Sequence, residues 1–303
     1  YAVRMSKGAH IVVPGDAIKS ESGVIIKTDV SVLFIIPWGD KWIVGTTDTD
    51  YNESREEPLA TADDVTYIIN QANRVLEPKL RRDQVIGVFA GLRPLVSTDP
   101  DSPTTKLSRE HVVDSPIRGF VSIAGGKYTT YRVMAEDAVD EAINHLRRLV
   151  PESVTETLAI IGAEGYSALM NQIPRLAQEF EISESTVEHL LNRYGSLIEE
   201  VLAPALQDSE LLQPVIPGLP YIGAEIVYAV THEGARSVDD VLSRRTRIAF
   251  EDRDQGLNAV DLVAELIAPH LGWRKVQKSA SIKEYQLIVE RQNQILKAAK
   301  KSA

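Results

Sequence analysis

The segment from Gly125 to Arg132 most constrains this chain of 303 residues, because it joins an apolar strand directly to a long helix. Residues 120–124 have the composition of a buried strand. Two glycines at such a junction let the backbone approach a ligand closely, and the first helical N–H groups have no intrahelical partner. Together with the helix dipole and the charge of Lys127, the junction predicts an anion site.

The helix itself is predicted by its period, since apolar residues recur in steps of four and three while acidic residues fall elsewhere. Thr129 or Thr130 is expected to cap its N-terminus through the side-chain hydroxyl. The apolar positions are Ala135, Val139, Ala142, Leu146 and Leu149.

A second cation lies about thirty residues upstream. Residues 85–90 predict an apolar strand that ends at Gly91, which places Arg93 at the strand end, just before a proline. Two strand ends would then each deliver one cation, an arrangement that suits a small phosphorylated or carboxylated substrate. The structural alternatives are a tight turn with a solvated Lys127, and an arginine that only supports its strand.

Composition excludes several classes of function. The chain has a net charge of −10, which disfavours a general nucleic-acid binder, since such a protein must neutralise phosphates. It has no cysteine, so disulfides and thiolate metal sites are excluded, and its six scattered histidines predict no metal cluster. No apolar run approaches the roughly twenty residues of a membrane-spanning helix.

The pattern along the chain changes near Pro151. Residues 1–150 are rich in strands, with a hairpin turn at 38–41 and, besides the helix after Gly125, a helix capped by Thr61. Residues 151–303 are helical, with a capping box at 185–188. The sequence therefore predicts two domains that meet there. The other predicted strands cover 10–13, 23–28, 32–36, 42–46 and 112–114.

Several segments in order resemble the FAD-dependent glycerol-3-phosphate dehydrogenases. The resemblance implies an α/β fold, with part of a DAO-like oxidoreductase domain at 1–150 and the helical C-terminal domain of this family at 151–303. It is carried by Gly91–Leu95 and Gly125–Arg132 together with Lys7–Pro14, Ile36–Trp38, Gly45–Asp48, Arg193–Ser196 and Asp239–Arg247. Within the last of these, Arg244, Arg245 and Arg247 are expected to form a structural ion-pair network.

The resemblance implies that the enzyme oxidises sn-glycerol 3-phosphate to dihydroxyacetone phosphate with FAD and passes the electrons to a quinone. Arg93 and Lys127 are then expected to bind substrate, and His10 and Lys127 to be catalytic. His10 has an ordinary pKa of roughly 6.5, which suits a proton acceptor, although a histidine in an apolar strand can equally be a core residue. The residues expected at FAD are Gly125, Gly126, Lys127, Tyr128 and Thr129.

The family's dinucleotide-binding motif, Gly-x-Gly-x-x-Gly after a first strand, is absent from this sequence. The sequence is therefore expected to be the C-terminal portion of a longer enzyme, inactive alone and homo-oligomeric at full length. Two alternatives remain open: a non-catalytic module that docks onto a partner, and an amine or amino-acid oxidase of the same fold.

Residues 274–303 carry eight Lys or Arg against two Glu, opposite in sign to the rest of the chain. Apolar residues are interleaved with these charges, a pattern that suits either an anionic membrane surface or a solvated terminal helix. The expected location is cytoplasmic, because a chain without cysteine suits a reducing compartment. The tail adds the expectation of a peripheral contact at the inner face of the cell membrane, with a solvated helix as the alternative. The apolar residues are Ile282, Tyr285, Leu287, Ile288, Ile295 and Leu296.

Overall fold

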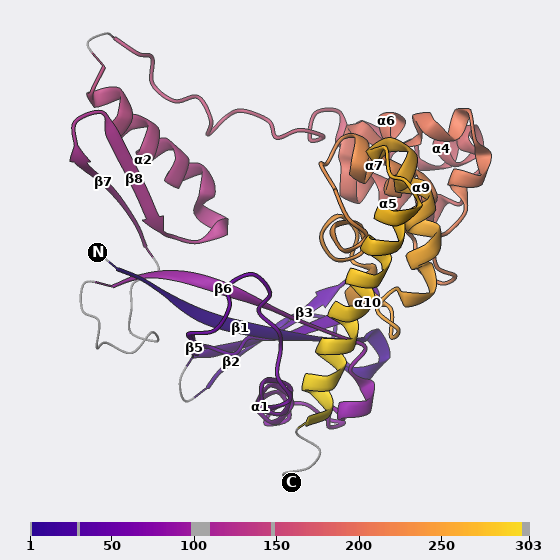
Figure 1. Ribbon diagram of the computed structural model, residues 1–303, viewed down its shortest axis with the longest axis horizontal. Coiled ribbons are helices and arrows are strands. Elements are labelled where there is room, and N and C mark those ends of the chain that lie inside the picture. Colours follow the sequence, from indigo (N-terminus) through magenta and orange to yellow (C-terminus); the bar gives the residue numbers. More distant parts are fainter. Residues whose placement is uncertain (1, 29–30, 98–109, 147–148, 299–303) are drawn as a thin grey trace. The chain divides into compact units, whose positions relative to one another are not determined.

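The computed structural model describes residues 2–28, 31–97, 110–146 and 149–298 and divides the chain into two compact units. Unit 1 comprises Tyr1–Leu158 and Ile295–Ala303, and unit 2 comprises Ala159–Gln294. Unit 1 holds the strands and unit 2 is helical (Figure 1). The predicted fold class, a sheet-containing module followed by a helical one, is confirmed.

Unit 1 is built on an antiparallel sheet around β1 (Ala2–Pro14). β4 pairs with residues 10–14 of β1 and β5 with residues 5–7, while β6 pairs with β1 from Ala2 to Val12 and so occupies its other edge. A hairpin joins β3 to β4, as predicted, with Gly39 at φ +60° in its turn. The other strands are β2 (Val24–Lys27), β3 (Val32–Trp38), β4 (Lys41–Gly45), β5 (Thr49–Tyr51) and β6 (Gly87–Ser97).

Helix α1 (Ala62–Ala72) covers one face of this sheet. Its N-cap is Thr61, as predicted, and Asp64 completes the capping box. Because side chains alternate along a strand, every second residue of β1 faces α1, and Ala9, Ile11 and Val13 are fully buried there.

A buried ion pair fixes α1 to the sheet. Lys7 Nζ lies 2.7 Å from Asp64 Oδ2 and donates to the carbonyl oxygen of Leu59 at 3.3 Å. The two side chains are 8% and 5% exposed. Asp64 also accepts hydrogen bonds from the backbone and hydroxyl of Thr61, so its carboxylate joins the helix cap to β1.

The remainder of unit 1 is a hairpin of β7 (His111–Ile117) and β8 (Phe120–Gly125), followed by α2 (Tyr131–Asn144). The helix begins where the sequence predicts it but ends at Asn144, before Leu146 and Leu149 of the predicted stripe. The stripe is exposed, with Val139 at 56% on the helix and Leu146 at 48% beyond its end. The reason is that α2 meets the hairpin through polar contacts: His111 bonds Asp137 at 2.6 Å, and Ser115 bonds the ring of His145 at 2.7 Å.

Unit 2 packs its helices around two apolar clusters, one including Leu176, Leu190 and Ile198 and the other Ile226, Val263 and Tyr285. None of the described helices is both long and apolar enough to cross a bilayer. The helices are α3 (Tyr166–Met170), α4 (Ile173–Phe180), α5 (Glu184–Tyr194), α6 (Ile198–Leu202), α7 (Gly223–Thr231), α8 (Ile248–Glu251), α9 (Val260–Leu271) and α10 (Lys275–Ala298), with a π-helix at Asp240–Arg245.

The cap predicted for α5 is wrong by two residues. Ser183, not Ser185, is the N-cap, and its Oγ accepts from the backbone N–H of Thr186 at 3.1 Å. Both serines precede the same apolar run, so the sequence alone does not choose between them.

The buried pair gives the first prediction. Replacing Lys7 by Met leaves the carboxylate of Asp64 buried without its cation, and the free energy of unfolding of unit 1 should fall by about 3 kcal/mol. Arg81→Gln, which removes an exposed pair with Asp83 (65% and 71% exposed), should cost under about 1 kcal/mol. Urea denaturation of the two variants measures both values, and equal losses would contradict a special role for the buried pair.

Candidate functional site

Arg93 does not end a strand, contrary to the sequence prediction. It lies inside β6, whose pairing with β1 continues to Ser97 opposite Ala2. The proline that suggested a strand end, Pro94, fits within β6 because β1 is its one strand partner among the described residues, so β6 is an edge strand there.

The guanidinium of Arg93 crosses the sheet to the connection between β4 and β5. Nη2 donates to Thr46 Oγ1 at 2.9 Å, and Nη1 donates to the carbonyl oxygen of Thr47 at 3.3 Å. Nη1 also lies 3.8 Å from Asp48 Oδ1. The Gly-Thr-Thr-Asp segment that the sequence singled out is therefore the binding partner of Arg93 within the protein.

Glycines open the face of the sheet on which Arg93 lies. Opposite Arg93 on β1 is Ser6, and the next pairs on this face are Gly8 with Gly91 and His10 with Phe89. A Cβ on Gly8 would lie 2.5 Å from Arg93 Nη2, whereas one on Gly91 would meet nothing within 4 Å. Sequence patterns do not reveal this surface, because Gly8 and Gly91 lie in two distant segments and meet only through the strand register.

His10 lies on the same face and stacks on Phe89, with ring centroids 4.9 Å apart. Its Nδ1 is buried and has no hydrogen-bond partner among the described residues. Burial first, and then the nearby charge of Arg93, lower the pKa of His10 to about 4. The imidazole is therefore neutral at physiological pH, and the ordinary value assumed from the sequence is wrong.

The second prediction follows from this pKa. The His10 imidazole should gain its proton only near pH 4, and Arg93→Gln should raise the midpoint by removing a like charge while burial keeps it below about 6.5. Between the folded pKa of about 4 and the unfolded pKa of about 6.5, the unfolded chain binds a proton at His10 that the folded chain does not. The contribution of His10 to the free energy of unfolding is therefore fully present above about pH 6.5 and is lost as the pH falls through 4. NMR titration of the ring protons measures the midpoint. A wild-type midpoint between 6 and 7 would contradict the burial argument.

The Gly-Gly turn connects β8 to α2 through a short 3-10 helix, Tyr128–Thr130. Gly125 and Gly126 have φ of +77° and +85°, a region that side chains rarely adopt. Thr130 occupies the N-cap position of α2, one of the two residues predicted, but its side chain does not cap the helix. Its hydroxyl instead donates to the carbonyl oxygen of Lys127, which also accepts from the backbone N–H of Thr130 at 3.0 Å. The amides of residues 127–129 precede that bond and point to no acceptor in the part of the chain described.

The geometry at Gly125 gives a third prediction. An added Cβ would lie 2.8 Å from the carbonyl oxygen of Glu110 and 2.8 Å from Val96 Cγ2, so the backbone must move. Gly119 has a similar φ of +83° but open space around it. Gly125→Ala should therefore destabilise unit 1 by about 1–3 kcal/mol more than Gly119→Ala, as measured by urea denaturation. Equal losses would show that φ alone requires the glycine.

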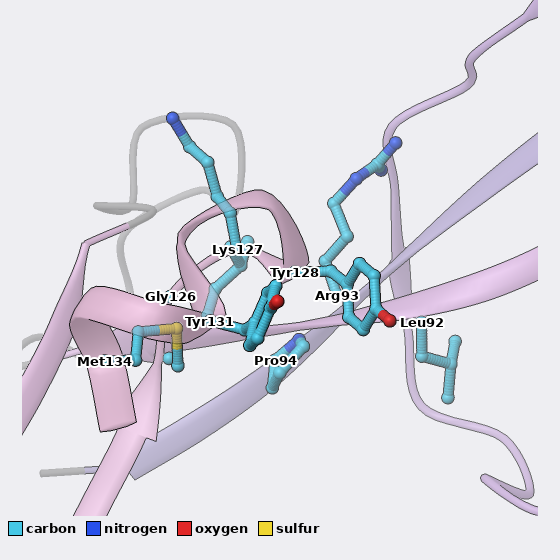
Figure 2. A pocket seen from close by; sticks show the side chains of 10 residues that line it. Leu92, Arg93, Pro94, Gly126, Lys127, Tyr128, Tyr131 and Met134 are labelled. Atoms are coloured by element: carbon cyan, nitrogen blue, oxygen red, sulfur yellow. The ribbon is translucent and has the colours of Figure 1, made fainter. Parts of the chain in front are cut away.

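One pocket of about 490 Å³ brings both predicted cations together. Figure 2 shows Arg93 on β6 and Lys127 on the turn extending toward the same side of the view. Tyr128 and Tyr131 stack beside them, with ring centroids 5.8 Å apart and exposures of 90% and 54%. The other lining residues are Leu92, Pro94, Leu95, Gly125, Gly126 and Met134.

Comparison with known proteins places the chain in a family. Residues 153–278 match the model for the C-terminal domain of alpha-glycerophosphate oxidase. "Glycerol-3-phosphate dehydrogenase 2" of Mycobacterium tuberculosis is 46% identical over 290 residues, which are 96% of this chain and 49% of that protein. The mitochondrial glycerol-3-phosphate dehydrogenase of Mus musculus is 33% identical over 285 residues, 91% of this chain and 39% of that protein.

The chain belongs to the glycerol-3-phosphate dehydrogenase family and matches a C-terminal portion of its members. A solved structure agrees: the glycerol-3-phosphate dehydrogenase from Bacillus halodurans complexed with FAD has a TM-score of 0.79 and 28% identity, covering 95% of this chain and 57% of that one. The chain spans about half the length of the curated relatives it matches.

Two of the segments that resemble the dehydrogenase family have structural roles in unit 2. Arg193 lies 3.4 Å from the fully buried carboxylate of Glu225, which also bonds His189 at 3.0 Å and Tyr194 at 3.1 Å. Arg244 pairs with Asp239 and Asp240, which confirms the expected ion pairing for this residue. Arg245 instead donates from Nε to the carbonyl oxygen of Glu233 at 2.8 Å. These segments hold helices together and lie outside the pocket of Arg93 and Lys127.

Proposed function

We propose that this chain supplies the substrate-facing part of an enzyme that oxidises sn-glycerol 3-phosphate to dihydroxyacetone phosphate with FAD. The observation that carries the proposal is the placement of Arg93 and Lys127 in one pocket. A phosphate ester carries close to two negative charges at neutral pH, and two cations match that charge. An amino-acid carboxylate would need only one of them, so the pocket favours the phosphorylated substrate over an amine or amino acid.

The same face of the chain fits a flavin. The Bacillus halodurans relative is an FAD complex, and here Gly91 leaves the sheet face open while the amides of residues 127–129 begin a helix. Those amides and Lys127 would hold the electron-rich edge of the ring system. The bound FAD would accept the hydride from C2 of the substrate.

His10 is the proposed proton acceptor for the C2 hydroxyl. It is neutral, its Nδ1 is unpartnered among the described residues, and it shares the sheet face with Arg93. A pKa of about 4 makes it a weak base in the empty chain. An anionic substrate nearby would offset the charge of Arg93 and raise this value.

The exposed apolar stripe of α2 supports a further part of the proposal. Val139 is about half exposed on a helix that begins at the proposed flavin site, and so is Leu146, just beyond the end of that helix. We propose that the half of the relatives outside the match, expected to carry the dinucleotide-binding motif, covers this stripe and completes the enzyme.

Electron transfer to a quinone at a membrane face is also part of the proposal, by family resemblance. The membrane contact that the sequence suggested for the terminal helix stays a prediction. Among the six apolar residues named for the tail, Leu287 is largely exposed, at 54%, and the others are buried or half-buried. Tyr285, 1% exposed, packs with Ile282 in an apolar cluster of unit 2, and Leu296 packs against the apolar core of unit 1. The cytoplasmic location and the homo-oligomer stay predictions.

The fourth prediction tests the proposed function. In the flavin-loaded enzyme, Arg93→Lys keeps the positive charge but loses the planar guanidinium fork, the paired N–H groups that bind an anion through two parallel hydrogen bonds. The value of kcat/KM for sn-glycerol 3-phosphate should therefore fall by roughly tenfold or more. Arg118→Lys, on the exposed β7–β8 turn, is the matched control and should leave kcat/KM unchanged. Flavin absorbance confirms equal loading. An unchanged kcat/KM for Arg93→Lys, or a wild-type enzyme that does not oxidise this substrate, would refute the assignment.

A further inference from the structure

We propose that Asp48 is a positioning residue that sets the orientation of the Arg93 guanidinium, an inference that rests on the proposed function in taking Arg93 as the phosphate ligand. The side chain of Asp48 is 2% exposed, against 27% for Arg93. Asp48 does not line the pocket, and Arg93 is a pocket residue that its carboxylate lies beside.

The carboxylate of Asp48 is itself fixed. Ser6 Oγ donates a hydrogen bond to Asp48 Oδ1, and Ser6 is the residue opposite Arg93 in the β1–β6 register. The carboxylate therefore lies over β1, between the strand that carries Arg93 and the connection to which the guanidinium binds.

The neighbouring acceptors are equally rigid. Thr47 is tied to Ala9 of β1 twice: the amide of Ala9 donates to Thr47 Oγ1 at 2.9 Å, and the amide of Thr47 donates to the carbonyl oxygen of Ala9 at 3.3 Å. This fixes the carbonyl oxygen of Thr47, which accepts from Arg93. A guanidinium held by such acceptors has one plane, so its fork is oriented before an anion arrives.

Gly8 makes this arrangement possible. Because Arg93 crosses β1 at this residue, a Cβ there would lie 2.5 Å from Nη2 and 2.8 Å from Cζ. Gly8 does not have positive φ, so alanine fits its backbone. Its Cβ would displace the flexible end of Arg93 and the Thr46 hydroxyl, 2.7 Å away, which accepts from Arg93 Nη2. Gly8→Ala is therefore a second route to the same disturbance that leaves Asp48 intact.

Charge and position make opposite predictions for Asp48→Asn. If Asp48 only weakened the positive field of Arg93, its loss would tighten anion binding. If it holds the guanidinium in place, its loss weakens the binding of a phosphate that needs the fork. The sign of the change therefore separates the two roles.

The test uses the flavin-loaded enzyme with sn-glycerol 3-phosphate as substrate and inorganic phosphate as competitive inhibitor. Asp48→Asn and Gly8→Ala should each raise KM and the inhibition constant of phosphate by roughly tenfold, with kcat within about twofold. Asp50→Asn, which removes an exposed carboxylate paired with Arg4, is the matched control and should change neither. In an Arg93→Lys background, Asp48→Asn should add little, since it acts through the fork.

NMR of the arginine side-chain Nε–H groups in the 303-residue chain gives a readout that does not depend on the reaction. The Arg93 signal should report a rigid side chain in the wild type and a mobile one in Asp48→Asn and Gly8→Ala. If the wild type does not oxidise the substrate, the proposed function fails while this measurement still decides the role of Asp48. An equally rigid Arg93 in both variants, tighter phosphate inhibition, or a full additional KM increase in the Arg93→Lys background would overturn the inference.

Discussion

The site depends on the register between β1 and β6, eleven residue pairs from Ala2 opposite Ser97 to Val12 opposite Gly87. Because side chains alternate across a strand, this register assigns each residue of β1 to one of two faces. A slip of one position would send Arg93 into the apolar layer under α1 and bring Leu92 or Pro94 to the open face. The ladder hydrogen bonds of the sheet therefore decide where the cation lies.

The alternation also explains why one short segment serves two purposes. Lys7 and His10 belong to the same sequence motif, yet Lys7 points to Asp64 beneath the sheet while His10 lies on the opposite face beside Phe89. The first stabilises the fold and the second is left with an unpartnered nitrogen. A motif match gives both residues equal weight, and only the strand period separates them.

Local patterns predicted the fold well, whereas long-range partners limited what could be said of the site. The β3–β4 turn and the Thr61 cap were predicted because their signals lie within four residues. Arg93 was misplaced because Pro94 usually ends a strand, and the sequence does not show that β6 is an edge. The pKa of His10 was also missed, since burial and the proximity of Arg93 arise from residues about eighty positions away. That both cations line one pocket was predicted from the chemistry of their segments, although the roles assigned to them stay predictions.

The two cations of the pocket, Arg93 and Lys127, differ in how firmly the protein holds them, so they should contribute differently to binding. Arg93 is held by Thr46 and Thr47 beside a buried carboxylate, so part of its charge is offset and its orientation is fixed. The side chain of Lys127 is a flexible stem on an exposed residue, and its ammonium makes no hydrogen bond or ion pair within the described residues. A fixed planar fork discriminates by geometry, whereas a mobile ammonium attracts any anion. Selectivity in this pocket should therefore reside mainly in Arg93, while Lys127 contributes charge that can follow the ligand.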